Sequence, residues 1–213
     1  MENTGVLLGS RETDWRAGAV SGITYKEILP IGDWRPFLPP GEWQWFTDGF
    51  ESFACVTFSD LNGVETQEKQ QTGKQVEYAD RFTATMSGTT QQGNYLWKVA
   101  DSVRKDGLVA ESRWPKPPAH PDGSTIAWGE YYAPVPIDVI NEANRWLLTW
   151  KLEYEVIDFT KESLIHHLKH APIQVVYPNH AVLLTCINDV YRIFDSYAPF
   201  QKERSEGFVF AQK

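Results

Sequence analysis

Residues 53–65 read FACVTFSDLNGVE, and one of the two cysteines of the chain, Cys55, opens the apolar part of this stretch. Apolar side chains recur after it at intervals of three residues, which is the spacing of a helix. Asn62 and Gly63 weaken that helix without breaking it. A cysteine in such a place is either a small hydrophobe in a core or a thiol that the helix can activate. The rest of the sequence has to separate these two interpretations.

The composition is that of a folded protein with one sizeable core. The chain has 213 residues, of which 42% are hydrophobic and 23% charged, so we expect one domain with two lobes rather than disorder. Its net charge of -8 argues against nucleic acid as a partner, because phosphate binding needs a basic face. The nine Trp side chains are interpreted mostly as core and as cleft walls.

From the sequence we expect neither a membrane segment nor a secretion signal. The first residues, MENTGVLLGSRETDWR, hold only a few consecutive apolar residues, and no stretch approaches the ~18 that a membrane helix needs. Two cysteines allow at most one disulfide bond, which is not the framework of a small secreted domain. We therefore expect no membrane partner and a protein that is cytoplasmic or enclosed in a larger particle.

The first half of the chain reads as an arm followed by helices. Residues 1–30 mix glycine, serine and charged residues without a sustained period, with one short strand expected at 22–30. Three prolines and a glycine make residues 33–45 extended and irregular. After the helix that begins at Cys55, we expect a helix that includes Tyr78 and Phe82, and another over 94–106 that Gly107 ends.

The second half is richer in strands. A crossing with four prolines, RWPKPPAHPDG at 113–123, separates the two halves. We expect an α+β layout with an arm at 1–30 and a domain at 31–213, which divides into a helical lobe at about 31–115 and a strand-rich lobe at about 116–213. The pattern predicts helices over 137–148 and 161–170, and strands over 149–157, 172–177, 181–187, 190–194 and 207–212.

Four side chains supply the parts of a thiol hydrolase. Attack by a thiol needs a thiolate, a proton acceptor, a group that orients the acceptor and donors for the oxyanion. Cys55 opens its helix, His180 begins an apolar strand, and Asp195 follows the next strand. Gln44 precedes Cys55 by eleven positions. Along the chain these side chains give the order Gln, Cys, His and Asp.

This order resembles that of the papain-like cysteine peptidases, and the resemblance extends over roughly residues 28–213. Each motif alone is weak, but seven in the family's order, several with its spacing, are specific. The resemblance implies a two-lobed fold with a helical N-terminal lobe, a sheet or barrel-like C-terminal lobe, and the active-site cleft between them. The motifs are LPIGDWR (29–35), EWQ (42–44), ACVTFS (54–59), Gly93–Asn94 followed by a helix, Gly107 and Trp114–Pro115, NHAV (179–182), DSY (195–197) and EGFVF (206–210).

The resemblance implies a role for each of the four side chains. Cys55 is the nucleophile, and the helix N-terminus and an imidazolium lower its pKa from about 8.5 to roughly 3.5–7.5. His180 takes and returns the proton, and Asp195 holds the imidazole ring. The Gln44 side chain and the Cys55 backbone N–H form the oxyanion hole, whose loss costs about 10²–10³ in turnover. The implied activity is hydrolysis of peptide or isopeptide bonds in a peptide or protein substrate, through an acyl-thioester and without a metal or an organic cofactor.

Substrate binding is also implied by the resemblance. The backbone around Gly93 and Asn94 is expected to pair with an extended substrate, as an added strand does. By position, Leu96 and Trp114 are expected to be walls of the adjacent side-chain pocket.

The chain departs from the family around the nucleophile. The gap between Gln44 and Cys55 is longer than the family's usual spacing, and WFTDGFESFA (45–54) replaces the usual Gly and Cys cluster. Asn94 replaces a glycine, and Tyr197 stands where a Trp normally shields the His pair. With about 30 residues ahead of the matching region, we expect the N-terminal arm not to act as the long inhibitory pro-segment of secreted members. These departures keep a second hypothesis open, in which the fold is a structural or binding component of a larger assembly, for example a phage particle, with little or no turnover.

The remaining candidates receive ordinary interpretations. Cys186 lies inside an apolar strand and is interpreted as core. His166 and His170 are four residues apart, so they share a helix face and could begin a metal site. A third ligand is not evident, and a solvated helix face is the preferred interpretation.

Overall fold

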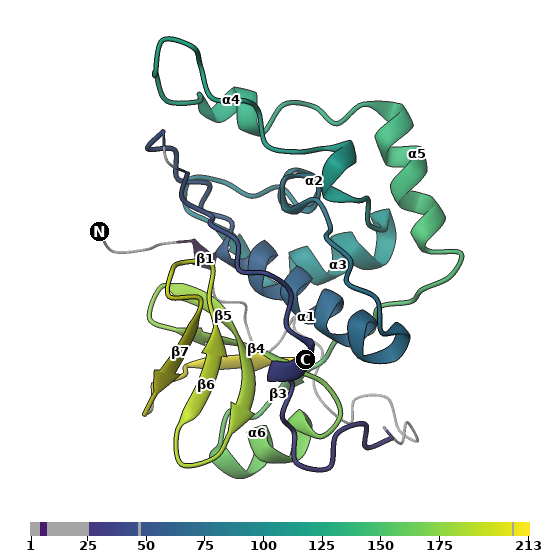
Figure 1. Ribbon diagram of the computed structural model, residues 1–213, viewed down its shortest axis with the longest axis vertical. Coiled ribbons are helices and arrows are strands. Elements are labelled where there is room, and N and C mark those ends of the chain that lie inside the picture. Colours follow the sequence, from purple (N-terminus) through teal and green to yellow (C-terminus); the bar gives the residue numbers. More distant parts are fainter. Residues whose placement is uncertain (1–4, 8–25, 47, 206) are drawn as a thin grey trace.

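The computed structural model of the chain describes residues 5–7, 26–46, 48–205 and 207–213, and it has two lobes (Figure 1). Helices fill the upper lobe in that view, and a six-stranded sheet fills the lower one, so the expected two-lobed α+β fold is confirmed. The helices are α1 (Cys55–Thr72), α2 (Asp80–Met86), α3 (Leu96–Asp106), α4 (Trp128–Tyr131), α5 (Ile137–Trp146) and α6 (Lys161–Leu168), with short 3-10 turns at Arg35–Phe37 and Glu111–Arg113. The strands are β1 (Val6–Leu7), β2 (Asn94–Tyr95), β3 (Val156–Ile157), β4 (Ile173–Tyr177), β5 (His180–Ile187), β6 (Tyr191–Phe194), β7 (Gln201–Arg204) and β8 (Phe210–Gln212).

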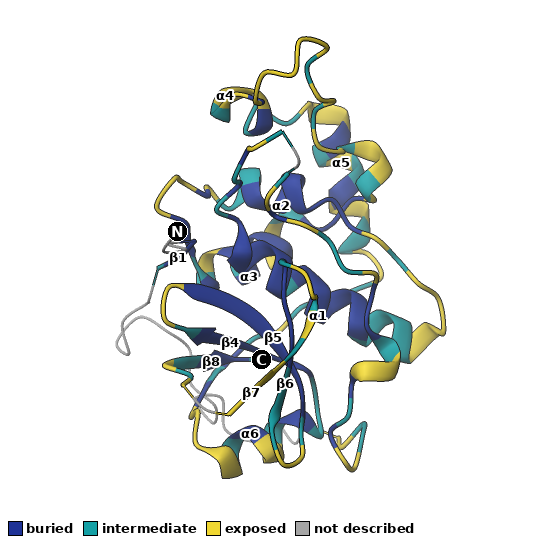
Figure 2. Cartoon of the chain, turned by 60° about the vertical axis from the view of Figure 1, so that its left-hand side comes forward, coloured by how far each residue is buried: buried dark blue, intermediate teal, exposed yellow. Residues whose placement is uncertain are grey.

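Helix α1 joins the two lobes, and its first half is buried (Figure 2). Its Gly63 lies so close to β5 that a Cβ at this position would be 3.3 Å from Cδ1 of Leu183. The glycine that weakens the helix therefore lets the helix approach the sheet. The helix runs unbroken for 18 residues and ends at Gly73, whose φ of 72° is left-handed. The helix predicted to begin at Cys55 is confirmed.

The helical lobe extends beyond the predicted boundary at residue 115. Val139 and Ala143 of α5 pack in one cluster with Phe82 of α2. Gly107 ends α3 as expected, and a side chain at this position would collide with the carbonyl of Ala143. The boundary is therefore wrong, because α5 contributes its apolar face to the first lobe. Among the described residues, no helix is both long and apolar enough to span a bilayer.

The sheet of the second lobe is antiparallel, with the order β3-β8-β4-β5-β6-β7. Strand β5 is central and buried nearly throughout, since α1 packs against it. A tight turn joins β4 to β5, pairing Tyr177 with His180, and Asn179 in this turn has a φ of 62°. Asn tolerates that left-handed conformation better than most side chains. The turn fixes His180 at the first position of β5.

A segment ahead of α1 belongs to the strand-rich lobe. Trp34 is fully buried in the core of that lobe. Its indole Nε1 donates to the carbonyl of Leu168 at 2.7 Å, and its backbone N–H donates to the carbonyl of Thr185 at 2.9 Å. The DWR motif therefore attaches this segment to the sheet through Trp34. The prediction that the helical lobe begins at residue 31 is wrong, because Trp34 lies in the core of the strand-rich lobe.

Two predicted strands are absent or shortened. Over 149–157 only Val156–Ile157 forms a strand, because backbone pairing with the C-terminal segment reaches back no further than Glu155. The strand expected at 22–30 does not form over 26–30, and the rest of that stretch lies outside the described residues.

One strand has no apolar signal in the sequence. Strand β7 reads QKER and is mostly exposed, so no hydrophobic alternation indicates it. It forms as an edge strand because β6 offers a free edge, with Phe194 opposite Gln201 and Ile193 opposite Lys202.

Candidate active site

Cys55 is the first residue of α1 and is fully buried. Ala54 before it supplies no side-chain cap to the helix. The N-terminus of a helix carries partial positive charge and favours a thiolate. Ser59, one turn later, donates from Oγ to the carbonyl oxygen of Cys55 at 2.8 Å. The helix therefore presents the thiol at its N-terminus, as the sequence predicts.

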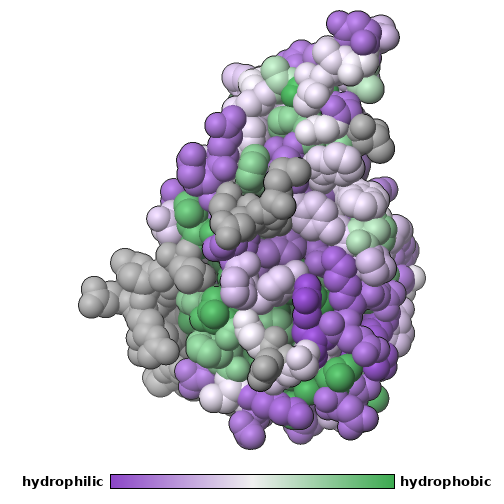
Figure 3. Space-filling view, turned by 90° about the vertical axis from the view of Figure 1, so that its left-hand side faces the viewer, coloured by the Kyte–Doolittle hydropathy of each residue, from purple (hydrophilic) through white to green (hydrophobic). Residues whose placement is uncertain are grey.

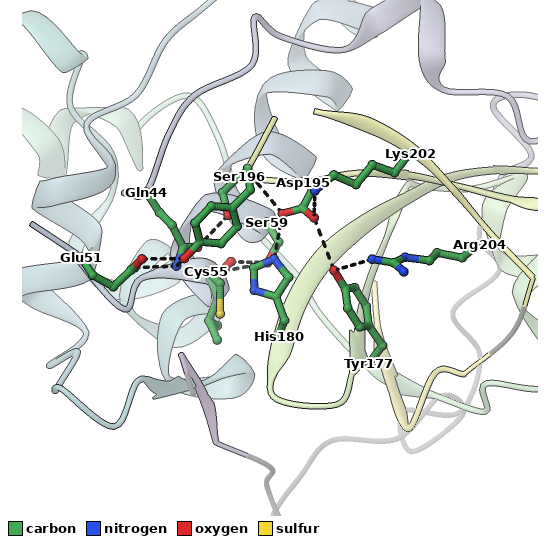
Figure 4. Close-up of polar contacts among 12 residues, drawn as sticks. Gln44, Glu51, Cys55, Ser59, Tyr177, His180, Asp195, Ser196, Lys202 and Arg204 are labelled. Atoms are coloured by element: carbon green, nitrogen blue, oxygen red, sulfur yellow. Dashed lines mark hydrogen bonds and ion pairs between the residues drawn. The ribbon is translucent and has the colours of Figure 1, made fainter. Parts of the chain in front are cut away.

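His180 and Asp195 meet beside Cys55, as Figure 4 shows. Nε2 of His180 lies 2.7 Å from Oδ1 of Asp195, and the ring is also hydrogen-bonded to Cys55. Burial works against the imidazolium, but the hydrogen bonds to Asp195 and Cys55 outweigh burial and raise the pKa of His180 to about 9. The ring is therefore held in its charged form near neutral pH.

Asp195 has a second strong partner, Lys202 of β7. The Lys202 ammonium lies 2.7 Å from Oδ2 of Asp195, and the hydroxyl of Tyr177 donates to the same oxygen at 3.3 Å. Burial opposes ionisation of Asp195, but the hydrogen bond from His180 and the charge of Lys202 hold its pKa below the ordinary value. Lys202 was missed by the sequence analysis, because it lies on the polar edge strand that carries no apolar pattern.

Gln44 is fully buried, and its amide is engaged at both ends. Its Nε2 donates to Oε1 of Glu51 and to the hydroxyl of Tyr197, both at 2.8 Å. Its Oε1 accepts a hydrogen bond from Oγ of Ser196 at 2.6 Å. The longer lead-in still returns Gln44 to the neighbourhood of Cys55 (Figure 4), but both N–H groups of the amide already have acceptors.

Glu51 is a site residue that the sequence analysis missed. Its carboxylate accepts from Gln44, from the hydroxyl of Tyr197 at 2.6 Å and from the backbone N–H of Phe53 at 3.0 Å. Phe53 has a φ of 54°, a strained conformation for a residue that is not glycine. The only signal in the sequence is the unusual lead-in at 45–54. This lead-in places the Glu51 carboxylate where the resemblance to papain-like peptidases implies small residues, and the carboxylate binds the Gln44 amide.

The strand edge predicted to bind substrate is already paired. The backbone N–H of Asn94 donates to the carbonyl of Gly5 at 3.1 Å, and β1 runs parallel to β2 with Val6 opposite Asn94. Gly93 has a φ of 92°, and a side chain there would collide with the backbone of Gly5. Residues 5–7 therefore occupy the edge that the sequence analysis predicts to bind substrate.

The Asn94 side chain does not obstruct this edge. Its Nδ2 donates to Oγ of Ser87 at 2.9 Å and to Oγ1 of Thr89 at 3.2 Å. Its Oδ1 accepts from the backbone N–H of Tyr95 at 2.8 Å. The side chain points toward Ser87 and Thr89, so it does not prevent the backbone of Asn94 from pairing with a strand such as β1.

Val6 is buried in an apolar cluster that also contains Cys55. Figure 3 looks onto this side of the molecule, where the visible hydrophobic side chains form small separate groups among hydrophilic ones. Leu96, predicted as a wall of the substrate side-chain pocket, is buried in the same cluster as Val6. The buried members of this cluster are Val6, Cys55, Val56, Leu96, Val99, Val176 and Ala181.

Trp114 is not brought to the cleft. It packs against the cluster of Ala79, Phe82 and Val109 in the helical lobe, with the Arg81 guanidinium 4.4 Å from its ring centre. Its predicted role as a pocket wall beside Leu96 is wrong, because the chain turns away into the core of that lobe after α3.

The other candidates lie apart from this site. Cys186 is buried in β5, and both cysteines are free. The rings of His166 and His170 are 5.3 Å apart on α6, but among the described residues no three His, Cys, Asp or Glu side chains gather as a metal site would require.

The fold is similar to that of solved cysteine proteases. Xylellain from Xylella fastidiosa is similar over 97% of this chain and 88% of its own, with a TM-score of 0.63 and 16% identity. Procathepsin L2 proteinase from Tenebrio molitor larval midgut is similar over 99% of this chain and 77% of its own, with a TM-score of 0.65 and 12% identity. The Carica candamarcensis cysteine protease CMS1MS2, solved in complex with E-64, is similar over 84% of this chain and 95% of its own, with a TM-score of 0.59 and 15% identity.

Sequence comparison alone does not reach these proteins. No protein-family model matches the chain, and a search of curated proteins finds no significant match. At such low identity the structural likeness establishes architecture rather than activity. The chain has the papain-like two-lobed fold, as a divergent example of it.

Proposed function

We propose that the protein is a cysteine peptidase that hydrolyses peptide or isopeptide bonds through an acyl-thioester on Cys55. One observation carries the proposal: Cys55 begins α1, His180 begins β5, Asp195 directly follows β6, and the His180 ring is hydrogen-bonded to both of the others. Three chemically matched side chains meeting beside a helix N-terminus is the arrangement that thiol attack requires. The cysteine proteases with a similar fold add support.

The chemistry follows from the positions of these side chains. The Cys55 thiolate attacks the carbonyl carbon, and the His180 imidazolium donates a proton to the departing amine. His180, now neutral, takes a proton from water, which attacks the thioester and releases the acid. Asp195 keeps the ring oriented throughout, through its 2.7 Å bond to Nε2.

The oxyanion hole requires a rearrangement. The backbone N–H of Cys55 and the amide of Gln44 are the proposed donors. Both N–H groups of that amide bind Glu51 and Tyr197, so one of them must be released before it can bind an oxyanion. The Glu51 carboxylate also has to move or be shielded, because it repels developing negative charge.

Substrate binding requires a second change. A peptide that pairs with β2 competes with residues 5–7 for the same backbone groups. The proposed peptidase is therefore held in a self-occupied state, in which the substrate or another event displaces β1.

The pairing of thiolate and imidazolium can be tested by alkylation. In a Cys186→Ala background, Cys55 is the only thiol, and its reaction with iodoacetamide is measured against pH. We expect a rate that stays nearly level from about pH 5 to the titration of His180 at about 9. His180→Ala should slow the reaction at low pH by at least about 10-fold, whereas the exposed His166→Ala should leave it unchanged. A rate that rises only near the free thiol range, with His180 present, would contradict the mechanism.

A second candidate function is a structural or binding component of a larger assembly. The engaged Gln44 amide and the occupied β2 edge favour it, because both block turnover in the arrangement described. Hydrolysis of a mixed peptide library by the protein, but not by Cys55→Ala, supports the peptidase. The protein is also tested after removal of residues 1–7. If neither form hydrolyses the library while Cys55 still shows the alkylation profile of a thiolate–imidazolium pair, the result supports the hypothesis of an assembly component.

A further inference from the structure

A pocket lies between α1 and the strand-rich lobe, apart from the candidate active site. None of the side chains proposed as catalytic lines it. Its volume is about 330 Å³, which is in the range of sites for small metabolites. Its apolar walls include Val64, Leu152, Ala171, Pro172 and Leu183, and its polar lining includes Asp60, Gln174 and Gln212.

Two buried glutamines that line this pocket each have an acceptor oxygen without a hydrogen-bond partner among the described residues. Gln174 is 4% exposed, and its Nε2 donates to the carbonyl of Val56 at 2.8 Å and to Oγ of Ser59 at 2.7 Å. Since Val56 offers only an acceptor, these bonds fix the amide with Oε1 unbonded among the described residues. Gln212 is 2% exposed and lies opposite Gln174 on the neighbouring strand, and its Oε1 likewise has no partner in the described part of the chain.

A carboxylate adds a third acceptor. Oδ2 of Asp60 is buried and has no hydrogen-bond partner among the residues described. Burial raises the pKa of Asp60 to about 7, which is typical of a carboxyl group without a nearby cation to stabilise its charge. The buried lysine of the pocket, Lys213, is already paired with Glu155 at 2.8 Å, and Lys26 and Lys151 are exposed to solvent.

We propose that this pocket binds a small aliphatic amine or guanidine. A buried acceptor without a donor is costly, and three residues that line this one cavity each carry such an acceptor. With small side-chain rotations, a group with several N–H bonds satisfies them together. An ammonium or guanidinium supplies those bonds and the charge that Asp60 lacks, while an alkyl chain fits the apolar walls. The pocket also adjoins the nucleophile helix, because Gln174 bonds to Ser59, which bonds to the carbonyl of Cys55.

Calorimetric titration of the full chain tests the proposal. The protein carries Cys55→Ala, so that binding does not depend on turnover, and the probes are putrescine and agmatine, with 1,4-butanediol as the neutral counterpart of putrescine. Asp60→Asn keeps the shape of the side chain and removes its charge. Gln212→Leu removes a second acceptor, and Asp122→Asn is the matched control at an exposed acid.

We expect saturable binding of at least one amine, and weaker binding of the diol by at least about 10-fold. Asp60→Asn should weaken amine binding by about 10- to 100-fold, Gln212→Leu by several-fold, and Asp122→Asn should leave it unchanged. The proposal is overturned if neither amine binds up to roughly 10 mM, if the diol binds as well as putrescine, or if Asp60→Asn and Asp122→Asn behave alike. Thermal unfolding of each variant verifies that it is folded.

Discussion

The polar groups on the two sides of Cys55 are engaged in opposite ways. On one side, His180, Asp195 and Lys202 form a buried series of opposite charges that holds the imidazolium ready for proton transfer. On the other side, the Gln44 amide gives both of its N–H groups to Glu51 and Tyr197. The proposed proton-transfer side is therefore assembled, whereas the amide proposed for the oxyanion hole is bound to the chain's own acceptors. For the proposed peptidase, this difference places control with the groups that a substrate would displace.

The largest expected effect is on the Gln44 side. If the amide is released to bind the oxyanion, Gln44→Ala should lower kcat by about 10²–10³ with a smaller change in KM. Ser196→Ala, which removes the bond to the other end of the amide, is the matched control and should cost less. An unchanged kcat in Gln44→Ala would mean that Gln44 only supports Glu51. The Gln44 side of Cys55 would then have no role in catalysis.

The next effect concerns β1. Burying a valine contributes about 1.5–3 kcal/mol, so Val6→Asp should displace β1 from the cleft and raise the rate of peptide hydrolysis by about 10- to 100-fold. Val209→Asp, at a valine that is 43% exposed, is the control and should have little effect. Steady-state kinetics with a peptide substrate measures both. Equal rates in the two variants would show that residues 5–7 do not compete with substrate.

A smaller effect is expected on the proton-transfer side. Lys202 pairs with the Asp195 carboxylate and partly neutralises it. Lys202→Met therefore strengthens the interaction of Asp195 with the His180 imidazolium and removes a positive charge close to that ring. Both changes raise the pKa of His180 above about 9, and the upper pH limit of thiol alkylation should move up by about one unit. The exposed Lys161→Met serves as control. A limit that stays in place or moves down would contradict the role given to Lys202.

The shifted pKa values of His180 and Asp195 also make the free energy of unfolding depend on pH. Because the pKa of His180 is raised, its contribution to the free energy of unfolding is full below the ordinary value of 6.5 and is lost as pH rises through about 9. Asp195 acts in the opposite sense, because its pKa is lowered and its contribution is lost as pH falls.

The smallest effect lies behind the Gln44 segment, where half-buried carboxyl groups lie close to one another. Burial raises the pKa of Glu42 to about 7 and of Glu111 to about 8, so the stability of the helical lobe is full below their ordinary value of 4.5 and is lost as pH rises through about 7–8. Glu111→Gln should reduce the fall in Tm between pH 6 and pH 9 by a few degrees. The exposed Glu162→Gln should not. An unaltered fall in Glu111→Gln would contradict the assignment.

Much of the fold followed from local patterns. The apolar spacing after Cys55 predicts α1, and the runs at 172–177 and 181–187 predict the two central strands, because a buried helix face and a buried strand each need continuous apolar side chains. Strand β7 and the end of the helical lobe were not predicted. One depends on a free edge of β6, and the other on which core receives α5.

The sequence by itself determined the order of Gln44, Cys55, His180 and Asp195. It also indicated the helix that begins at Cys55 and the strands next to His180 and Asp195, since these elements are strongly patterned, whereas Gln44 lies in an irregular segment. Only the tertiary structure decided which groups meet there: Lys202 on Asp195, Glu51 on Gln44 and Val6 beside the nucleophile. These contacts join residues far apart in the chain or within an irregular loop, where neither hydrophobic period nor turn chemistry fixes the direction of a side chain. The sequence thus determined which reactive groups are present, and packing decided that residues 5–7 pair with the strand edge predicted to bind substrate.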